Sequence, residues 1–87
     1  MGTVECIELE GYDLKFYSSD HWPPHFHCAK SGEWEIRVFI LSTTEEAIDM
    51  SIKWGDGPKS KVRRTLRDLV LKHREQLLME WEQKVNY

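Results

Sequence analysis

Alternating apolar and polar residues predict that most of the first two thirds of this chain forms β-strands. Residues 12–17 alternate strictly between the two kinds of side chain. Residues 3–10 follow the same period less regularly, and Gly11 separates the two segments. We therefore predict that these segments pair as an antiparallel hairpin.

A second hairpin is predicted where residues 25–29 and 33–41 flank a Lys-Ser-Gly segment. A three-residue loop ending in glycine is a common hairpin connection, and here it pairs His27 with Glu35. A two-residue turn would instead set polar residues against apolar partners across a face that should be dry. The core face of the preferred register carries Phe26, Cys28, Trp34, Ile36, Val38 and Ile40. Its polar face, which we expect to point away from the core toward solvent, carries His25, His27, Glu33, Glu35 and Arg37.

A fifth strand and a long helix complete the predicted fold. Residues 48–54 alternate again, and a segment containing Gly and Pro ends that strand. Residues 59–84 contain neither Gly nor Pro, and apolar residues recur there every three or four positions, which is typical of an amphipathic helix. So long a run can be kinked or split near His73 and Arg74, and the sequence does not fix the position of the break. We predict one α+β domain over residues 1–87, a small, mostly antiparallel sheet of about five strands with a C-terminal helix, kinked or split, packed on one face.

The composition is that of a single folded domain. The chain has 87 residues, of which 40% are hydrophobic and 11% aromatic, too many for a disordered acidic segment. The longest unbroken apolar run is residues 38–41, and the N-terminus lacks the pattern of a signal peptide. We therefore expect a soluble, cytoplasmic protein that makes no use of a membrane. Cys6 and Cys28 are too few for a disulfide framework, and we interpret them as buried thiols.

Charge is unevenly distributed along the chain. Residues 1–57 carry 4 basic and 11 acidic side chains, net −7, whereas residues 58–87 carry 8 basic and 4 acidic ones, net +4. This asymmetry suits either two complementary elements or a bipolar surface that meets a protein partner or a second copy of the chain. The basic residues on the predicted helix surface include Lys59, Arg63, Arg64, Arg67 and Arg74. Such a flank can meet phosphates or simply face solvent, and the pI of about 5.8 argues against strong nonspecific binding to nucleic acid.

Three of the four histidines, His21, His25 and His27, lie within seven positions. Residues two apart on a strand project to the same side, so the imidazoles of His25 and His27 can reach one ion. His21 could supply a third ligand. Asp20, or Glu35 directly across the strand pair, would instead complete a nitrogen and oxygen site with an open position, typical of catalytic zinc or another late divalent metal. Two alternatives stay open: metal-free acid and base chemistry by neighbouring imidazoles, and ordinary polar residues beside a rigid diproline corner.

Residues 12–28 resemble the signature of a bacterial family catalogued as domain of unknown function 4160. The resemblance rests on an aromatic strand, an acidic residue, the motif His-x-Pro-Pro-His-x-His, and a leucine-rich ending at residues 77–82. Cys28 stands where the family usually has valine, and residues 42–56 do not follow the family pattern closely. The signature positions are Asp20, His21, Pro23, Pro24, His25 and His27. The resemblance implies no settled activity, but it implies a gene beside a second small gene, as in a toxin–antitoxin pair.

These observations give three hypotheses about function. The leading one is a small bacterial interaction or regulatory module, part of a toxin–antitoxin-like gene pair, that binds a protein partner or itself. The alternative is a metal-dependent enzyme, hydrolytic in class, with histidine ligands. The third is nucleic-acid binding through the basic helix. The sequence does not decide whether the chain is an enzyme.

Overall fold

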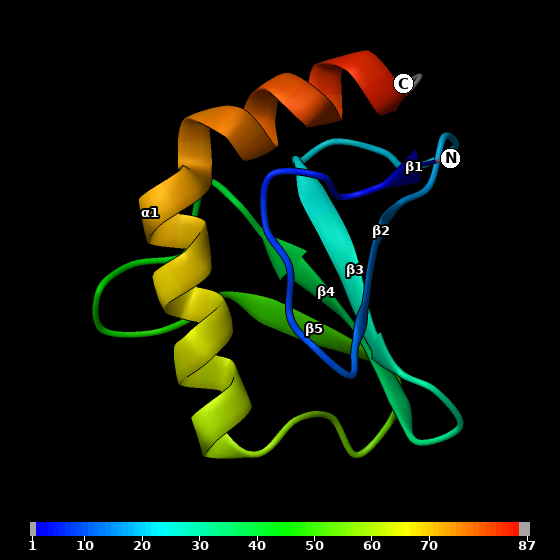
Figure 1. Ribbon diagram of the computed structural model, residues 1–87, viewed down its shortest axis with the longest axis vertical. Helices are drawn as coiled ribbons and strands as arrows, with labels where there is room; N and C mark the ends of the chain where they lie inside the picture. Colours follow the sequence, from blue (N-terminus) through cyan, green and yellow to red (C-terminus); the bar gives the residue numbers. More distant parts are fainter. Residues whose placement is uncertain (1, 86–87) are drawn as a thin grey trace.

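The computed structural model describes residues 2–85 and shows a five-stranded sheet with one C-terminal helix (Figure 1). The strands are β1 (Gly2–Thr3), β2 (Asp13–Phe16), β3 (His25–Lys30), β4 (Trp34–Phe39) and β5 (Met50–Gly55), and helix α1 is Ser60–Lys84. The strands lie in chain order, and each pairs antiparallel with the next. The predicted α+β fold is confirmed.

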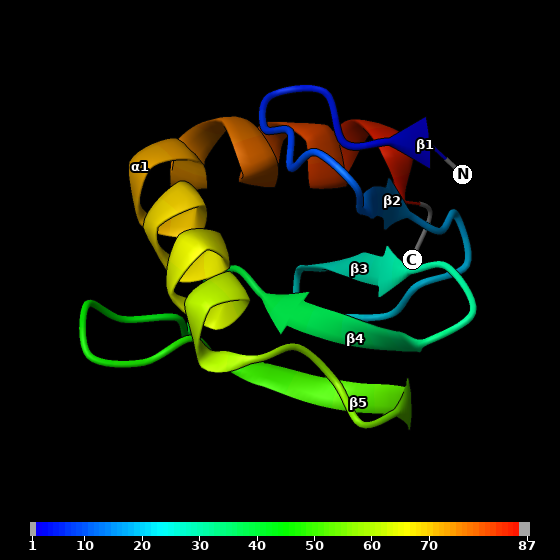
Figure 2. The same ribbon diagram turned by 60° about the horizontal axis from the view of Figure 1, so that its bottom comes forward.

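The helix packs on one face of the sheet and closes the hydrophobic core (Figure 2). The predicted core face is confirmed, because each of its residues is buried: Phe26, Cys28, Trp34, Ile36, Val38 and Ile40. The helix contributes Leu66, Val70, Leu77 and Trp81 to the same cluster. Within each half of the helix these residues are four positions apart, which explains why one stripe of α1 is apolar.

Helix α1 bends at His73, whose φ of −117° and ψ of 23° are not helical. The first half runs beside the sheet, and the second half turns across the ends of the strands toward β1 (Figures 1 and 2). The helix is thus kinked at His73, a position that the sequence left open, and the bend lets one helix cover both a face and an end of the sheet. Within residues 2–85, no helix is long and apolar enough to cross a membrane.

The register of the hairpin between β3 and β4 differs from the prediction by two residues. His27 lies opposite Arg37, not Glu35. The loop is residues 31–33, and Gly32 adopts a φ of +76° as the third residue of a turn in which the Glu33 amide donates to the Lys30 carbonyl at 2.9 Å. The prediction placed glycine at the end of the loop, and its register was wrong for that reason. Because the shift is two residues, every side chain keeps its predicted face.

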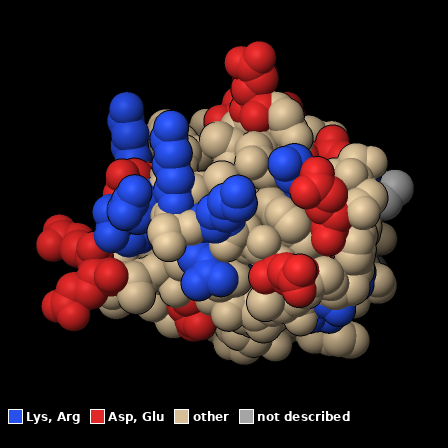
Figure 3. Space-filling model, turned by 90° about the horizontal axis from the view of Figure 1, so that it is seen from below, with Lys and Arg blue, Asp and Glu red and all other residues tan. Residues whose placement is uncertain are grey.

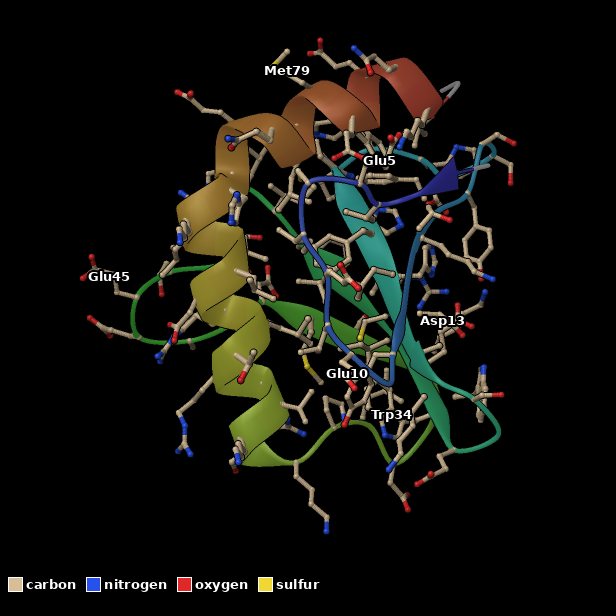
Figure 4. All side chains as sticks on the ribbon, in the orientation of Figure 1. Glu5, Glu10, Asp13, Trp34, Glu45 and Met79 are labelled. Carbon is tan, nitrogen blue, oxygen red and sulfur yellow. The ribbon has the colours of Figure 1, made fainter. Side chains whose placement is uncertain are left out.

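Most of the strand predicted at residues 3–10 is irregular, and only its first residue, Thr3, belongs to β1. The backbone amides of Glu5 and Cys6 donate to the two carboxylate oxygens of Glu80, each at 2.8 Å, instead of to a neighbouring strand. Glu5 accordingly lies beneath the second half of α1 (Figure 4). A side-chain carboxylate thus satisfies backbone donors that a sheet ladder would otherwise take.

Strand β5 forms the far edge of the sheet and carries a bulge. Glu35 lies opposite Trp54 and Ile36 opposite Ile52, so Lys53 is an extra residue on β5. Lys53 reaches across to the carboxylate of Glu35, and its ammonium lies 5.0 Å from the centre of the Tyr17 ring. Lys53 has the same parity as Ser51, the partner of Arg37, so the cation lies on the polar face of the sheet despite the bulge.

Candidate metal centre

Strand β3 holds His25 and His27 on one face, and the segment between β2 and β3 folds back to place Asp20 beside them. Asp20 is fixed by a tight turn, in which its carboxylate accepts from the Tyr17 amide at 3.2 Å and its own amide donates to the Tyr17 carbonyl at 3.0 Å. Its Oδ1 and Oδ2 each lie 3.1 Å from Nε2 of His27, and Oδ1 lies 3.6 Å from Nε2 of His25. Asp20 thus shares one small site with His25 and His27, which follow it by five and seven positions in the sequence.

Both imidazoles are buried, and the expectation that they face solvent was wrong. The exposed fractions are 6% for His25 and 3% for His27. The Tyr17 ring stands edge-on to that of His27, with 4.2 Å between ring centres, and the Trp81 ring lies 5.4 Å from that of His25. The polar face of β3 is therefore covered by the returning segment and by the end of α1.

The hydrogen bond at Nδ1 of His25 shows that this ring nitrogen carries a hydrogen. Nδ1 lies 2.8 Å from the carbonyl oxygen of Pro23, and a carbonyl can only accept, so Nδ1 carries the hydrogen. In the neutral ring, Nε2 then presents a lone pair toward Asp20. A lone pair aimed at a carboxylate is repulsive unless a proton or a metal ion lies between them.

His27 lies between two carboxylates. Its Nδ1 is 3.1 Å from Oε2 of Glu35, and its Nε2 faces Asp20. Burial lowers the pKa of His27 below its ordinary value, and this outweighs the raising effect of Asp20 and Glu35. The neutral ring has one N–H to share between two acceptors, so one nitrogen always presents a lone pair to a carboxylate.

Glu35 is held ionised by its surroundings. Burial alone would raise its pKa, but the Lys53 ammonium at 3.2 Å and the neighbouring His27 outweigh burial and lower the pKa of Glu35. In the tautomer in which Nδ1 of His27 donates to Glu35, Nε2 is the free nitrogen. In that tautomer, each histidine donates from Nδ1 to an outer partner and turns Nε2 toward Asp20.

One ligand atom each from Asp20, His25 and His27 can be chosen so that all three lie within 4.8 Å of one another. Two imidazole nitrogens and a carboxylate oxygen are ligands that divalent transition metals accept. In metal sites, a hydrogen bond at the ring nitrogen that does not bind the metal orients each histidine ligand. Nδ1 makes such a contact here, with Pro23 in His25 and with Glu35 in His27.

The structure does not bring all of the predicted ligands together. His21 is exposed and is not in the three-residue group. Glu35 does not lie directly across from His27 but diagonally, and it contacts Nδ1, the outer side of the ring. Pro24 is buried, and Pro23 contributes its carbonyl.

Sequence reasoning missed two residues of the site, Tyr17 and Lys53. Both lie on the polar side of an alternating segment, which was the available signal. That signal does not say which of several polar residues on separate strands will meet. Alternation already places Lys53 on the same face as Ser51, and Lys53 contacts Glu35 even though the bulge shifts the pairing beside it.

The predicted basic surface divides into two parts. Lys59, Arg63 and Arg64 are exposed at the start of α1 and Arg67 is half-buried, and basic side chains gather there in Figure 3. Arg74 is not part of that surface, because it donates to the Thr43 carbonyl in the connection between β4 and β5.

Comparisons with known proteins give one match. The family described as Domain of unknown function (DUF4160) matches residues 11–82. No curated protein and no solved structure matches the chain. Because the match covers most of the 87 residues, including the whole histidine cluster, the chain belongs to the DUF4160 family.

Proposed function

We propose that Asp20, His25 and His27 bind a divalent transition metal ion and that the protein acts through this ion. One observation carries the proposal: Nδ1 of each histidine lies against an outer acceptor, and Nε2 of each faces the same carboxylate. With neutral rings and neither a proton nor a metal ion between them, this arrangement places lone pairs against a carboxylate, which costs free energy. A metal ion among the three side chains removes that repulsion.

The ligand set favours a catalytic over a purely structural ion. Structural zinc sites use four protein ligands, whereas three leave a position for water. A water bound to such an ion loses a proton near neutral pH, which provides a nucleophile for hydrolysis. We therefore propose hydrolysis as the class of reaction, with zinc as the first ion to test.

Metal analysis of protein purified without an affinity tag tests this proposal. We expect about one equivalent of a transition metal per chain, or uptake of one equivalent of Zn²⁺ on titration. His25→Ala and Asp20→Ala should abolish that uptake, while His21→Ala, a matched control at an exposed histidine, should retain it. Less than about a tenth of an equivalent with no uptake on titration would contradict the proposal.

The interaction-module hypothesis stays a prediction, and one surface feature favours it. Strand β5 is an edge strand whose Ile52 and Trp54 are 47% and 44% exposed. Exposed apolar residues on an unpaired edge suit the addition of a partner strand. Sedimentation of purified protein tests self-association, and Trp54→Lys should abolish any dimer that forms there. The toxin–antitoxin pairing and the cytoplasmic location also stay predictions.

A further inference from the structure

We propose that a hollow at the start of α1 binds a phosphate ester, a site separate from the metal centre. The hollow has a volume of about 260 Å³ and lies between the helix and the connection from β4 to β5. From the helix it is lined by Ser60, Arg63, Arg64 and Arg67, and from the connection by Glu46, Ala47 and Ile48. Seen from below, Lys and Arg side chains gather over this part of the molecule (Figure 3).

The arginines share one flank of the helix and retain unused donors. Positions 60, 63, 64 and 67 follow a spacing of three and four, so they lie on one side of the helix. Arg63 uses Nε to bond the Pro58 carbonyl, and Arg67 uses Nε and Nη2 on Asp68. Arg64 has no hydrogen-bond or ion-pair partner among residues 2–85. Guanidinium groups with unused N–H donors are suited to paired hydrogen bonds with phosphate oxygens.

The local electrostatics also favour an anion. The first turn of α1 contains no acidic residue, and its N-cap, Lys59, makes no capping hydrogen bond through its side chain. Cations beside the positive end of a helix dipole repel it and one another, which destabilises the free protein. Asp68 and Glu46 offset part of this charge, but three guanidinium groups face one hollow. A bound phosphate would relieve the remaining repulsion.

The opposite wall of the hollow is held in place. Arg74 donates to the Thr43 carbonyl, and the Thr43 hydroxyl donates to the Phe39 carbonyl at 2.8 Å and accepts from the Asp49 amide at 3.0 Å. These contacts fix the connection against the helix. Ala47 and Ile48 on this wall offer apolar surface to the organic part of an ester, which inorganic phosphate lacks.

Titration with three probes tests the proposal: pyrophosphate, a mononucleotide, and a labelled single-stranded RNA of about ten nucleotides, a length above the ~4-nucleotide lower limit of known single-strand sites. All are measured in EDTA, so that a metal ion cannot contribute. We expect saturable shifts of the Arg side-chain resonances in NMR spectra and binding that Arg64→Gln/Arg67→Gln weakens about tenfold or more. Lys30→Gln/Lys72→Gln removes the same charge outside the hollow and should have little effect.

The pattern across probes identifies the source of the phosphate. Preferential binding of the mononucleotide identifies a small ester. Preferential binding of RNA, with a log–log salt slope of about −0.7 per phosphate contact, identifies a nucleic-acid backbone. No saturable binding of any probe would overturn the proposal, as would equal binding of poly-L-glutamate or equal weakening by the lysine control.

Discussion

The two faces of β3 are buried to a similar degree by different means. Phe26 and Cys28 are 0% exposed beneath the helix, whereas His25 and His27 are 6% and 3% exposed on the other side. The helix covers the first face with apolar side chains, whereas hydrogen-bonding groups of a returning segment, together with the Trp81 ring at the end of α1, cover the second. A polar face of a strand is therefore not always a solvated one. Its burial is tolerable when partners for its polar atoms are buried with it.

The largest loss of stability should come from a substitution on the apolar face. Trp81 is 1% exposed and its ring packs edge-on against that of Phe16. Truncating so large a buried aromatic side chain costs about 3–5 kcal/mol, a large part of the stability of a small domain. We expect Trp81→Ala to be largely unfolded in urea titrations followed by circular dichroism. Met79→Ala, on the same helix but 61% exposed and pointing outward in Figure 4, is the matched control and should unfold like wild type.

The polar face should contribute less to the free energy of unfolding, and its contribution should depend on metal. In EDTA, His27→Ala should lower the free energy of unfolding by about 1–3 kcal/mol, because it removes the hydrogen-bond partner of the buried Glu35 carboxylate. With excess Zn²⁺, wild type should gain stability by mass action and the variant should not. If His27→Ala in EDTA lost as much stability as Trp81→Ala, the polar face would contribute as much to the free energy of unfolding as the apolar face, which would contradict this prediction.

The contact of Glu80 with the N-terminal segment should be sensitive to pH. Burial would raise its pKa, but hydrogen bonds from Cys6, Lys84 and the Glu5 amide outweigh burial and lower the pKa of Glu80 to about 2. A carboxyl whose pKa is depressed in the folded state stabilises the fold above its unfolded pKa, and this contribution is lost as the pH falls through the folded pKa. We expect Glu80→Gln to cost roughly 2 kcal/mol at pH 7, and the difference from wild type to shrink between about pH 5 and pH 2. A difference that does not change with pH would contradict this account.

The smallest effect should come from Lys53, which reaches the polar face from outside. Its side chain is 39% exposed, and exposed ion pairs contribute less than about 1 kcal/mol. Lys53→Met should therefore change stability little, but it should raise the pKa of Glu35, measured by NMR titration of the side-chain carboxyl. An unchanged pKa of Glu35 would show that Lys53 does not act on the site.

Local pattern was enough to predict the elements and their faces. Alternation placed Phe26 with Ile36 and His25 with His27, and helical spacing grouped Leu66, Leu77 and the other core residues of α1. These properties survived an error of two residues in the hairpin register, because side chains on a strand repeat every two residues. The length of the helical run also suggested a kink or split near His73 and Arg74, but only the structure fixed the bend at His73.

The site itself was decided by tertiary structure. The sequence named Asp20 only as one of three candidates for a third ligand, and it could not show that Tyr17 and Lys53 join the site, because alternation does not say which residues of separate strands meet. Burial of the histidines likewise depends on groups distant along the chain, such as Trp81. Alternation is a property of neighbouring residues, whereas the protonation and burial of an imidazole depend on every group packed around it. The chain alone therefore determined which side of the strand the histidines occupy, and the fold determined that they meet a carboxylate there, away from water.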